Sequence, residues 1–410
     1  MLPVPANVRE VCRVLTDAGF EAVTVGGAVR DALLGRDPGD WDVATSARPE
    51  QVIDLFRHTI PTGLQHGTVT VVTGRGAHTH VEVTTFRGEG AYTDARRPDH
   101  VVFGVPLVED LARRDLTVNA MAYDPANNVL IDPFGGQADV AARRLRAVGD
   151  AIARFTEDGL RVMRAVRFAA QLECELDPDT EAGIAPALPS LAKVSRERVC
   201  EELRKILETR QPSRGLVPAV RTGIMKTILP ELPEVLVDRV DRATPRARLA
   251  ALMVPLASPD ALPLQLDRGV QKRVGEILRG LKFSNAELEA ASQLVAVSHA
   301  PRQEVWTAPE VRRLLAQVRR DLREPAIELW ETDVNAALPA LARQVLRDPL
   351  EVGDLAITGK QLMDALQMPP GPAVGRILGM LLQKVLDDPS RNTGETLLAD
   401  AQVLELEVGR

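Results

Sequence analysis

The feature that most restricts the fold of this chain is a change in its apolar pattern near residue 140. Before that point, segments such as EAVTVGG, GTVTVVTG and HTHVEVTTF alternate polar and apolar residues or are rich in β-branched residues, as strands are. After it, segments such as GLRVMRAVRFAAQLE and GPAVGRILGMLLQKVL repeat apolar residues at helical spacing. The pattern predicts an α+β fold, in which a small α/β head with a mixed sheet precedes an all-helical remainder.

Length and composition narrow the class of protein. A chain of 410 residues exceeds one ordinary core, so two or more domains are expected. No apolar run is long enough to span a membrane, and the N-terminus does not resemble a signal peptide, so a cytoplasmic protein without a membrane partner is expected. Cys12, Cys174 and Cys200 form no CxxC pair and are expected to be reduced, buried thiols. The net charge of -7 argues against nucleic-acid binding through bulk charge, but not against a local basic surface.

Two glycines, Gly26 and Gly27, end the first expected strand and begin a helix. Backbone N–H groups at such a turn, free of side chains, can bind a phosphate. Arg30, one turn later, can add a charge-assisted hydrogen bond. The pair also fits an ordinary strand-to-helix turn, and no P-loop motif follows it.

Two aspartates follow this turn. Residues i and i+2 of a strand share a face, so Asp40 and Asp42 are expected to project together. Adjacent carboxylates suit Mg²⁺, which is bound through a few carboxylates, water and substrate phosphates. Such ions can activate a hydroxyl nucleophile and stabilise a leaving pyrophosphate. Glu82, in the segment HVEVTTF, is the candidate for a third carboxylate on an adjacent strand. A solvated turn is the alternative for the two aspartates.

The two motifs together resemble the signature of the class II tRNA nucleotidyltransferases, the family of the bacterial CCA-adding enzymes within the DNA polymerase beta superfamily. The likeness continues in order, from residue 25 to about residue 207, through TGLQHGTVTVV, EDLARRDLTVNAMAYD, IDPFGGQADV and EDGLRVMRAVRFAAQL. It implies a nucleotidyltransferase head, or palm, over residues 1–139, a helical base-reading neck over residues 140–207, and a helical tRNA-binding body and tail over residues 208–410.

The resemblance also implies an activity. A template-independent enzyme of this family adds C, C and A to the 3′ end of tRNA from CTP and ATP, with Mg²⁺ as cofactor and release of pyrophosphate. Asp40 and Asp42 would hold the metal, and Glu82 would be a third catalytic carboxylate. Gly27, Arg30 and Arg114 would hold the triphosphate side of the nucleotide. The chain is expected to be a monomer or a homodimer.

Three alternatives remain at this point. The first is an A-adding enzyme that acts after a separate CC-adding enzyme, which a single sequence does not exclude. The second is a poly(A) polymerase, disfavoured because the basic C-terminal extension of that family is not found. The third is an inactive tRNA-binding module, disfavoured because the glycine, aspartate and EDxxR motifs are intact.

The motif EDGLRVMRAVRF places Asp158, Arg161, Arg164 and Arg167 three residues apart, as one stripe of an expected helix. A carboxylate accepts hydrogen bonds and a guanidinium donates them. Asp158 and Arg161 together therefore match the amino group and ring nitrogen of cytosine and adenine, whereas guanine and uracil leave polar groups unpaired. Arg164 and Arg167 are expected to face the triphosphate or to support this base-reading pair. A solvated arginine face is the alternative.

Three further segments carry weaker expectations. The polar segment at residues 86–100 resembles the family's flexible loop, which helps to switch from C to A addition, and an ordinary surface loop is the alternative. Around Ser195 the family's last neck motif implies a structural role, with Ser195 as a helix N-cap and Arg198 as a helix-stabilising contact. Exposed basic residues of the body can contact the RNA backbone or form a solvated face: Arg268, Lys272, Arg273, Arg279 and Lys282.

Overall fold

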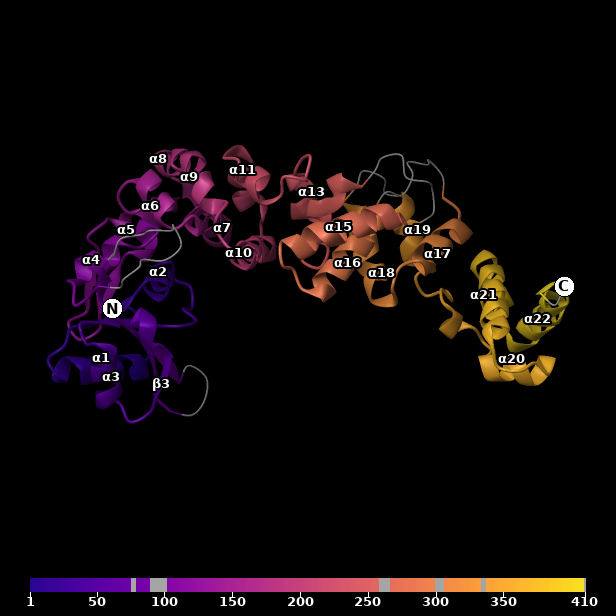
Figure 1. Ribbon diagram of the computed structural model, residues 1–410, viewed down its shortest axis with the longest axis horizontal. Coiled ribbons are helices and arrows are strands. Elements are labelled where there is room, and N and C mark those ends of the chain that lie inside the picture. Colours follow the sequence, from indigo (N-terminus) through magenta and orange to yellow (C-terminus); the bar gives the residue numbers. More distant parts are fainter. Residues whose placement is uncertain (75–78, 89–101, 258–265, 299–305, 333–336, 409–410) are drawn as a thin grey trace. The chain divides into compact units, whose positions relative to one another are not determined.

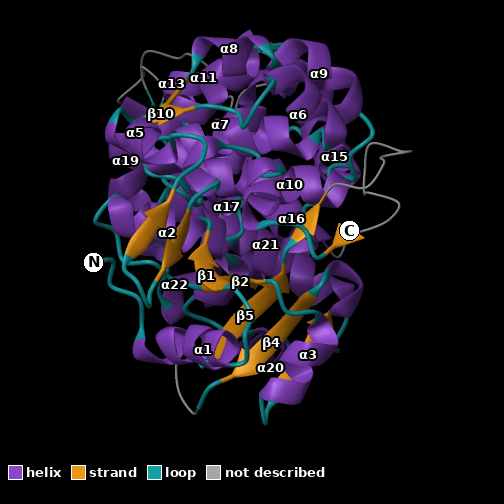
Figure 2. Cartoon of the chain, turned by 90° about the vertical axis from the view of Figure 1, so that its left-hand side faces the viewer, coloured by secondary structure: helices purple, strands orange, loops and turns teal. Residues whose placement is uncertain are grey.

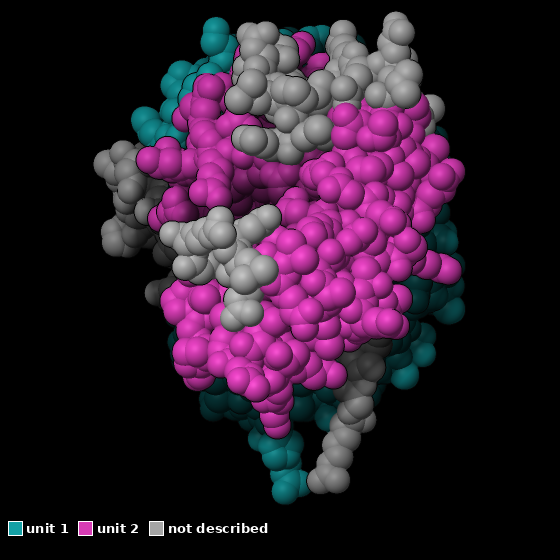
Figure 3. All heavy atoms as spheres, turned by 90° about the vertical axis from the view of Figure 1, so that its right-hand side faces the viewer, with its two compact units in different colours: residues 1–230 teal, residues 231–410 magenta. Residues whose placement is uncertain are grey.

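The computed structural model describes residues 1–74, 79–88, 102–257, 266–298, 306–332 and 337–408 (Figure 1). The chain divides into two compact units, residues 1–230 and 231–410, which Figure 3 colours separately. Both the expected head and the expected neck fall in the first unit. No helix in the described part of the chain is long and apolar enough to cross a membrane.

Unit 1 is built on a seven-stranded sheet with the order β3-β4-β5-β2-β1-β8-β9. The pairing of β2 with β5 is parallel and the other pairings are antiparallel, so the expected mixed sheet is confirmed. The segments GTVTVVTG and HTHVEVTTF, predicted to be strands, contain β4 and β5, which pair antiparallel. The strands are β1 (Ala22–Val25), β2 (Asp42–Thr45), β3 (Thr59–Gly63), β4 (Thr68–Val72), β5 (His80–Thr85), β8 (Ala122–Asp124) and β9 (Val129–Ile131).

Helices complete unit 1, and Figure 2 shows α1 and α3 beside the strands of the sheet. The two-residue strands β6 (Arg87–Gly88) and β7 (Val102–Phe103) pair with each other, as do β10 (Arg144–Leu145) and β11 (Glu175–Leu176). The helices are α1 (Ala6–Asp17), α2 (Gly27–Leu33), α3 (Pro49–Leu55), α4 (Leu107–Ala112), α5 (Gly136–Ala141), α6 (Ala151–Glu157), α7 (Leu160–Leu172), α8 (Pro178–Ala182), α9 (Ile184–Leu191), α10 (Arg196–Glu208), α11 (Ser213–Arg221) and α12 (Ile224–Ile228).

One apolar core joins the sheet to α7. Val43 of β2 and Val83 of β5 are buried in it together with Phe168 and Leu172 of α7. Successive residues of β5 point to opposite faces of the sheet. Val81 and Val83 are therefore buried in the core, while Glu82 between them is exposed on the other face. The shared core therefore holds the arginine stripe of α7 beside the sheet.

Unit 2 is helical in its described part, as the repeats of apolar residues predicted. A compact core near its C-terminus contains Leu362, Ile377, Leu381 and Leu397. The helices are α13 (Val237–Arg242), α14 (Arg248–Met253), α15 (Arg268–Gly280), α16 (Asn285–Ala296), α17 (Ala308–Ala316), α18 (Arg323–Glu331), α19 (Ala337–Val345), α20 (Gly359–Leu366), α21 (Pro372–Asp387) and α22 (Gly394–Val408).

Candidate active site

A cavity of about 600 Å³ in unit 1 collects side chains from the sheet, α2, α7 and α10. Of the ten residues predicted for the site, nine line this cavity and Asp40 does not. Its described lining is strongly charged, with an excess of arginine. The arginines are Arg30, Arg87, Arg113, Arg114, Arg161, Arg164, Arg167 and Arg198, and the carboxylates are Asp42, Glu82, Asp110, Asp115 and Asp158.

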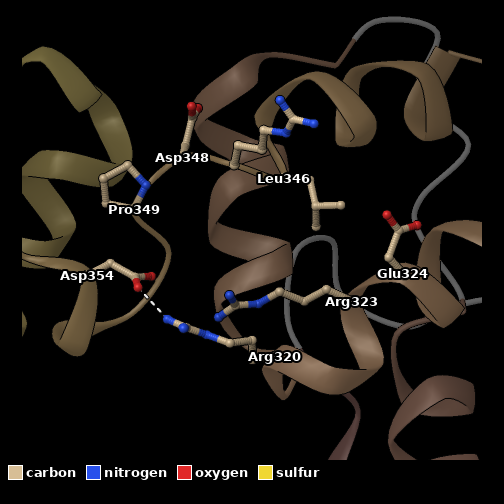
Figure 4. A pocket seen from close by; sticks show the side chains of 8 residues that line it. Arg320, Arg323, Glu324, Leu346, Asp348, Pro349 and Asp354 are labelled. Carbon is tan, nitrogen blue, oxygen red and sulfur yellow. Dashed lines mark hydrogen bonds and ion pairs between the residues drawn. The ribbon is translucent and has the colours of Figure 1, made fainter.

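A second cavity, of about 480 Å³, lies in unit 2 (Figure 4). There Arg320 points at Asp354 and forms an ion pair with it, and Arg323 pairs with Glu351 at 3.2 Å. Its described lining holds three arginines and three carboxylates, so it has no net charge to attract an anion. The arginine-rich cavity of unit 1 is therefore the candidate active site.

The glycine turn makes room for an arginine. Gly26 has φ +75°, a conformation that other residues rarely adopt, and a Cβ on it would lie 2.6 Å from Nη1 of Arg114. Gly27, the predicted site residue, begins α2 and lines the cavity without a positive φ. The structure therefore adds Gly26 to the site as the residue that admits Arg114.

Arg30 is more deeply buried than was expected of a residue that binds a phosphate. Its side chain is only 5% exposed, and it pairs with Asp31 at 2.9 Å. Nη1 also donates to Oδ1 of Asn119 at 2.5 Å, and Asn119 in turn donates to Asp115 at 3.0 Å. Asn119 was missed by the sequence reasoning, although it lies in the segment EDLARRDLTVNAMAYD quoted above. Arg30 thus adds positive charge to the wall while the neighbouring side chains fix its position.

The carboxylates do not share one strand. β2 begins at Asp42, and Asp40 lies in the exposed loop before it. The prediction that both aspartates project from one face of a strand was therefore wrong for Asp40. Glu82 lies on β5, which pairs in parallel with β2 through Val43 and Val83, so its expected place on an adjacent strand is confirmed. Asp42 and Glu82 both line the cavity.

The carboxyl group of Asp42 is a weaker acid than is usual for aspartate. Its side chain is open to the cavity, but protein surrounds it on the other sides, and this partial burial is the largest cause that raises its pKa to about 6. Glu82 raises the pKa further, Arg114 lowers it, and Asp40 raises it again. The carboxylates therefore place more negative charge around Asp42 than Arg114 offsets.

This charge fits a divalent cation. Carboxylate oxygens are the ligands that hard cations prefer, and a bound ion would offset the repulsion that raises the pKa of Asp42. The described residues contain no group of three or more His, Cys, Asp or Glu side chains placed to hold a metal by themselves. The donor set therefore fits an ion that completes its coordination with water and substrate, as Mg²⁺ does.

Arg114 has spare hydrogen-bonding capacity beside these carboxylates. Its Nε is buried and has no partner in the described residues, while Nη1 donates to the carbonyl oxygen of Asn119 at 3.3 Å. Burial lowers the pKa of Arg114, and the nearby Asp110 opposes that shift. A buried guanidinium with an unpaired N–H group suits an anionic ligand in the cavity.

The base-reading candidates reach the cavity from different segments. α7 begins at Leu160, so Asp158 precedes the helix and does not belong to its arginine stripe, contrary to expectation. Asp158 accepts hydrogen bonds from the backbone N–H of Leu160 at 3.0 Å and from Nη2 of Arg198 at 2.9 Å. Arg198 was expected to make a helix-stabilising contact. It instead binds Asp158, and it also lines the cavity.

Arg161 is held by Glu157 of α6 and by Arg113, the residue that follows α4. It donates to Oε2 of Glu157 at 2.6 Å and to the carbonyl oxygen of Arg113 at 3.0 Å. Asp158 and Arg161 therefore line one cavity, each oriented by its own partners. Ser195 is the N-cap residue of α10, as expected, but its side chain makes no capping hydrogen bond.

Arg164 and Arg167 extend the stripe along α7. Arg164 pairs with Asp115 at 2.7 Å, and Arg167 pairs with Glu202 of α10 at 2.5 Å. Burial would raise the pKa of Asp115, but Arg164 and the hydrogen bonds to Asn119 and Leu116 outweigh it and lower the pKa to about 2. Asp115 is therefore a fixed anion that orients Arg164.

The expected switching loop is only partly described. Phe86 is buried and residues 87–88 form β6, whereas residues 89–101 lie outside the described residues.

Comparison with known proteins agrees with this geometry. Residues 22–146 match the family model described as the poly A polymerase head domain. Two further models match: an RNA- and SrmB-binding site of polymerase A at residues 174–236, and domain 2 of tRNA nucleotidyltransferases at residues 262–401.

Full-length relatives are similar along nearly the whole chain. A CCA-adding enzyme of Geobacillus thermodenitrificans is 38% identical over 97% of this chain and 97% of its own length. One from Lactococcus lactis subsp. lactis is 36% identical over 97% of this chain and 96% of its own length. The crystal structure of the Bacillus stearothermophilus CCA-adding enzyme in complex with CTP superposes with a TM-score of 0.74 at 34% identity, covering 100% of this chain and 99% of that one.

The mixed sheet, its helical extension and the charged cavity define a nucleotidyltransferase. The chain belongs to the family of the CCA-adding enzymes, which are tRNA nucleotidyltransferases. Nucleotidyltransferases of this family generally use a divalent metal ion.

Proposed function

We propose that this chain adds C, C and A to the 3′ end of tRNA without a template, using CTP and ATP and releasing pyrophosphate. One observation carries the proposal: the cavity that holds Asp42 and Glu82 of the sheet also holds Asp158 and Arg161, which match cytosine and adenine. Membership of the CCA-adding family supports the same substrates.

The carboxylates serve the reacting phosphate. Asp42 and Glu82 would hold Mg²⁺, with Asp40 contributing from the preceding loop. An ion bound there would supply activation of the 3′-hydroxyl and charge neutralisation on the pyrophosphate. The 3′-hydroxyl attacks the α-phosphate of CTP or ATP, and the bond to the β-phosphate oxygen breaks. Arg114 donates its free N–H group to the triphosphate, beside the turn formed by Gly26 and Gly27.

The neck residues select the base. Asp158 accepts a hydrogen bond from the exocyclic amino group, and Arg161 donates to N3 of cytosine or N1 of adenine. Arg198 keeps the Asp158 carboxylate oriented, and Glu157 does the same for Arg161. A base with a carbonyl oxygen opposite Asp158 leaves buried polar groups unpaired, at about 1–3 kcal/mol each. The pair thus accepts C and A and rejects G and U.

The alternative activities, A addition alone and poly(A) synthesis, agree less well with the similarity to known proteins. Relatives that match this chain over almost their full length are CCA-adding enzymes, which favours complete CCA addition over A addition alone or poly(A) synthesis. We further propose that the head, neck, and body with tail follow the boundaries 1–139, 140–207 and 208–410. The three free, buried cysteines support a reducing compartment such as the cytoplasm.

The test supplies purified protein with tRNA that lacks CCA, CA or A, and with each labelled nucleotide in turn. Complete CCA addition requires C on the first two substrates and A on the third, with no G or U. Incorporation of A alone would assign the chain to the A-adding enzymes, and repeated addition of A would assign it to the poly(A) polymerases.

A further inference from the structure

Three arginines of the candidate active site surround a single aromatic ring. The guanidinium carbon of Arg167 lies 3.8 Å from the ring centroid of Phe168, and those of Arg30 and Arg164 lie at 5.1 and 5.3 Å. All four residues line the same cavity. A guanidinium within about 6 Å of a ring centroid is attracted by the negative face of the ring.

The three cations come from two different elements. Arg30 lies on α2 beside the glycine turn, whereas Arg164 and Arg167 lie on α7. Phe168 is 5% exposed and belongs to the core shared by the sheet and α7. The ring therefore links the cation of the glycine turn to the cations of the neck.

Each arginine also has an anionic partner outside this cluster. Arg30 pairs with Asp31, Arg164 with Asp115 and Arg167 with Glu202. Three like charges around one ring repel each other, and each carboxylate attracts a different one of them. The ring is the element that all three share, and its quadrupole offsets part of their repulsion.

We propose that Phe168 is a positioning residue that holds Arg30, Arg164 and Arg167 as a preassembled cationic wall for the phosphates of the incoming nucleotide. This inference deepens the proposed function and rests on it. Phe168 acts through the arginines and forms no bond to the substrate. A preassembled wall binds the triphosphate without first gathering its cations, so it lowers the cost of binding.

The test replaces Phe168 with phenylalanine analogues that carry one, three and five ring fluorines, introduced by amber suppression. Fluorination weakens the negative face of the ring stepwise while leaving its shape nearly unchanged. Phe155 is the matched control, because it is fully buried in α6 and no arginine lies over its ring among the described contacts. The dissociation constants of CTP, ATP and tripolyphosphate are measured in the absence of tRNA, together with the melting temperature.

We expect all three constants to rise with each step at Phe168, by about 2- to 30-fold at the pentafluoro ring, with the preference between CTP and ATP unchanged. The series at Phe155 should leave them unchanged. Constants that stay flat at Phe168, or that change equally at both positions, would overturn the inference and leave Phe168 a packing residue. A wild-type chain that binds nucleotides but adds none to tRNA would contradict the proposed function, while the binding series would still decide the role of Phe168.

Discussion

Among the single residues of the cavity, Asp42 combines an open carboxylate with two acidic neighbours, Glu82 and Asp40. Arg114 is the nearby cation that opposes them. This balance makes Asp42 the residue where a proton and a divalent cation compete most directly. We therefore expect Asp42 to govern two measurable properties of the chain, its catalytic rate and its affinity for metal.

Replacing the carboxylate of Asp42 with an amide, in the variant Asp42→Asn, should lower nucleotide incorporation by about 100-fold or more, because metal catalysis contributes several kcal/mol. Its affinity for tRNA should stay within about twofold, since RNA binding depends on other surfaces. Single-turnover incorporation and filter binding measure the two properties. Asp37→Asn, in the exposed loop after α2, is the control. Near-normal turnover by Asp42→Asn would remove Asp42 from the catalytic machinery.

The raised pKa of Asp42 also predicts a pH dependence. The pKa of Asp42 is raised from its ordinary value of 3.8 to about 6 in the folded chain. Its protonated carboxyl therefore stabilises the fold fully below pH 3.8, and this stabilisation is lost as the pH rises through about 6. Metal binding requires the ionised form. The affinity for Mg²⁺ should therefore fall up to about tenfold per pH unit below pH 6. Calorimetric titration between pH 5 and 8 measures it, and an unchanged affinity over this range would contradict the assignment.

At the scale of elements, α7 brings the neck to the sheet, because its apolar side joins the core beneath the strands while Arg161, Arg164 and Arg167 line the cavity. α10 adds Arg198 and Glu202, which pair with Asp158 and Arg167. The proposed base-reading residue Asp158 is thus oriented by a neighbouring helix as well as by its own segment.

Removing the base-directed donor, in the variant Arg161→Ala, should weaken incorporation of C and A and narrow the margin over U and G. The change in selectivity should be about 10-fold or more, since an unpaired buried group costs about 1–3 kcal/mol. Rates with all four nucleotides measure it, with Arg9→Ala on the exposed face of α1 as the control. Equal losses for all four nucleotides would assign Arg161 to the triphosphate instead.

The sequence allowed the elements to be predicted better than their ends and partners. Alternation in HVEVTTF placed Glu82 on its strand, because period-two burial is local information. The start of β2 at Asp42 and of α7 at Leu160 was missed, since helix and strand ends depend on tertiary contacts. Pairings across long separations, such as Arg198 with Asp158, have no local pattern to reveal them.

At the scale of the whole molecule, an acidic chain must still bind an acidic ligand. The net charge is -7, yet α15 and the turn after it carry five exposed basic residues, the set already named from Arg268 to Lys282. Lys272 has a distant acidic partner, Glu276 at 4.0 Å, which leaves this face basic. We therefore expect this basic surface to contact the RNA backbone despite the overall charge.

This surface predicts how tRNA binding responds to salt. The logarithm of the association constant should fall linearly with the logarithm of salt concentration, with a slope of roughly -0.7 to -0.9 for each phosphate contact. The double variant Arg273→Glu and Arg279→Glu should weaken binding and make that slope shallower by roughly one contact or more. Filter binding at several salt concentrations measures both, with Arg9→Glu as the control. A slope identical to that of wild type would show that this face of α15 does not contact the tRNA backbone.

The core that joins the sheet to α7 has a consequence for how the protein is made. A ribosome releases β2 and β5 long before Phe168 and Leu172, which complete their core. A nascent chain that ends at residue 139 therefore exposes an apolar surface that its own residues cannot cover, and such surfaces favour aggregation. The core gains Phe168 and Leu172, and the cavity gains Arg161, Arg164 and Arg167, only after α7 emerges. A chain that ends before α7 lacks Arg161, Arg164 and Arg167 of the cavity, so we expect it to bind nucleotides weakly.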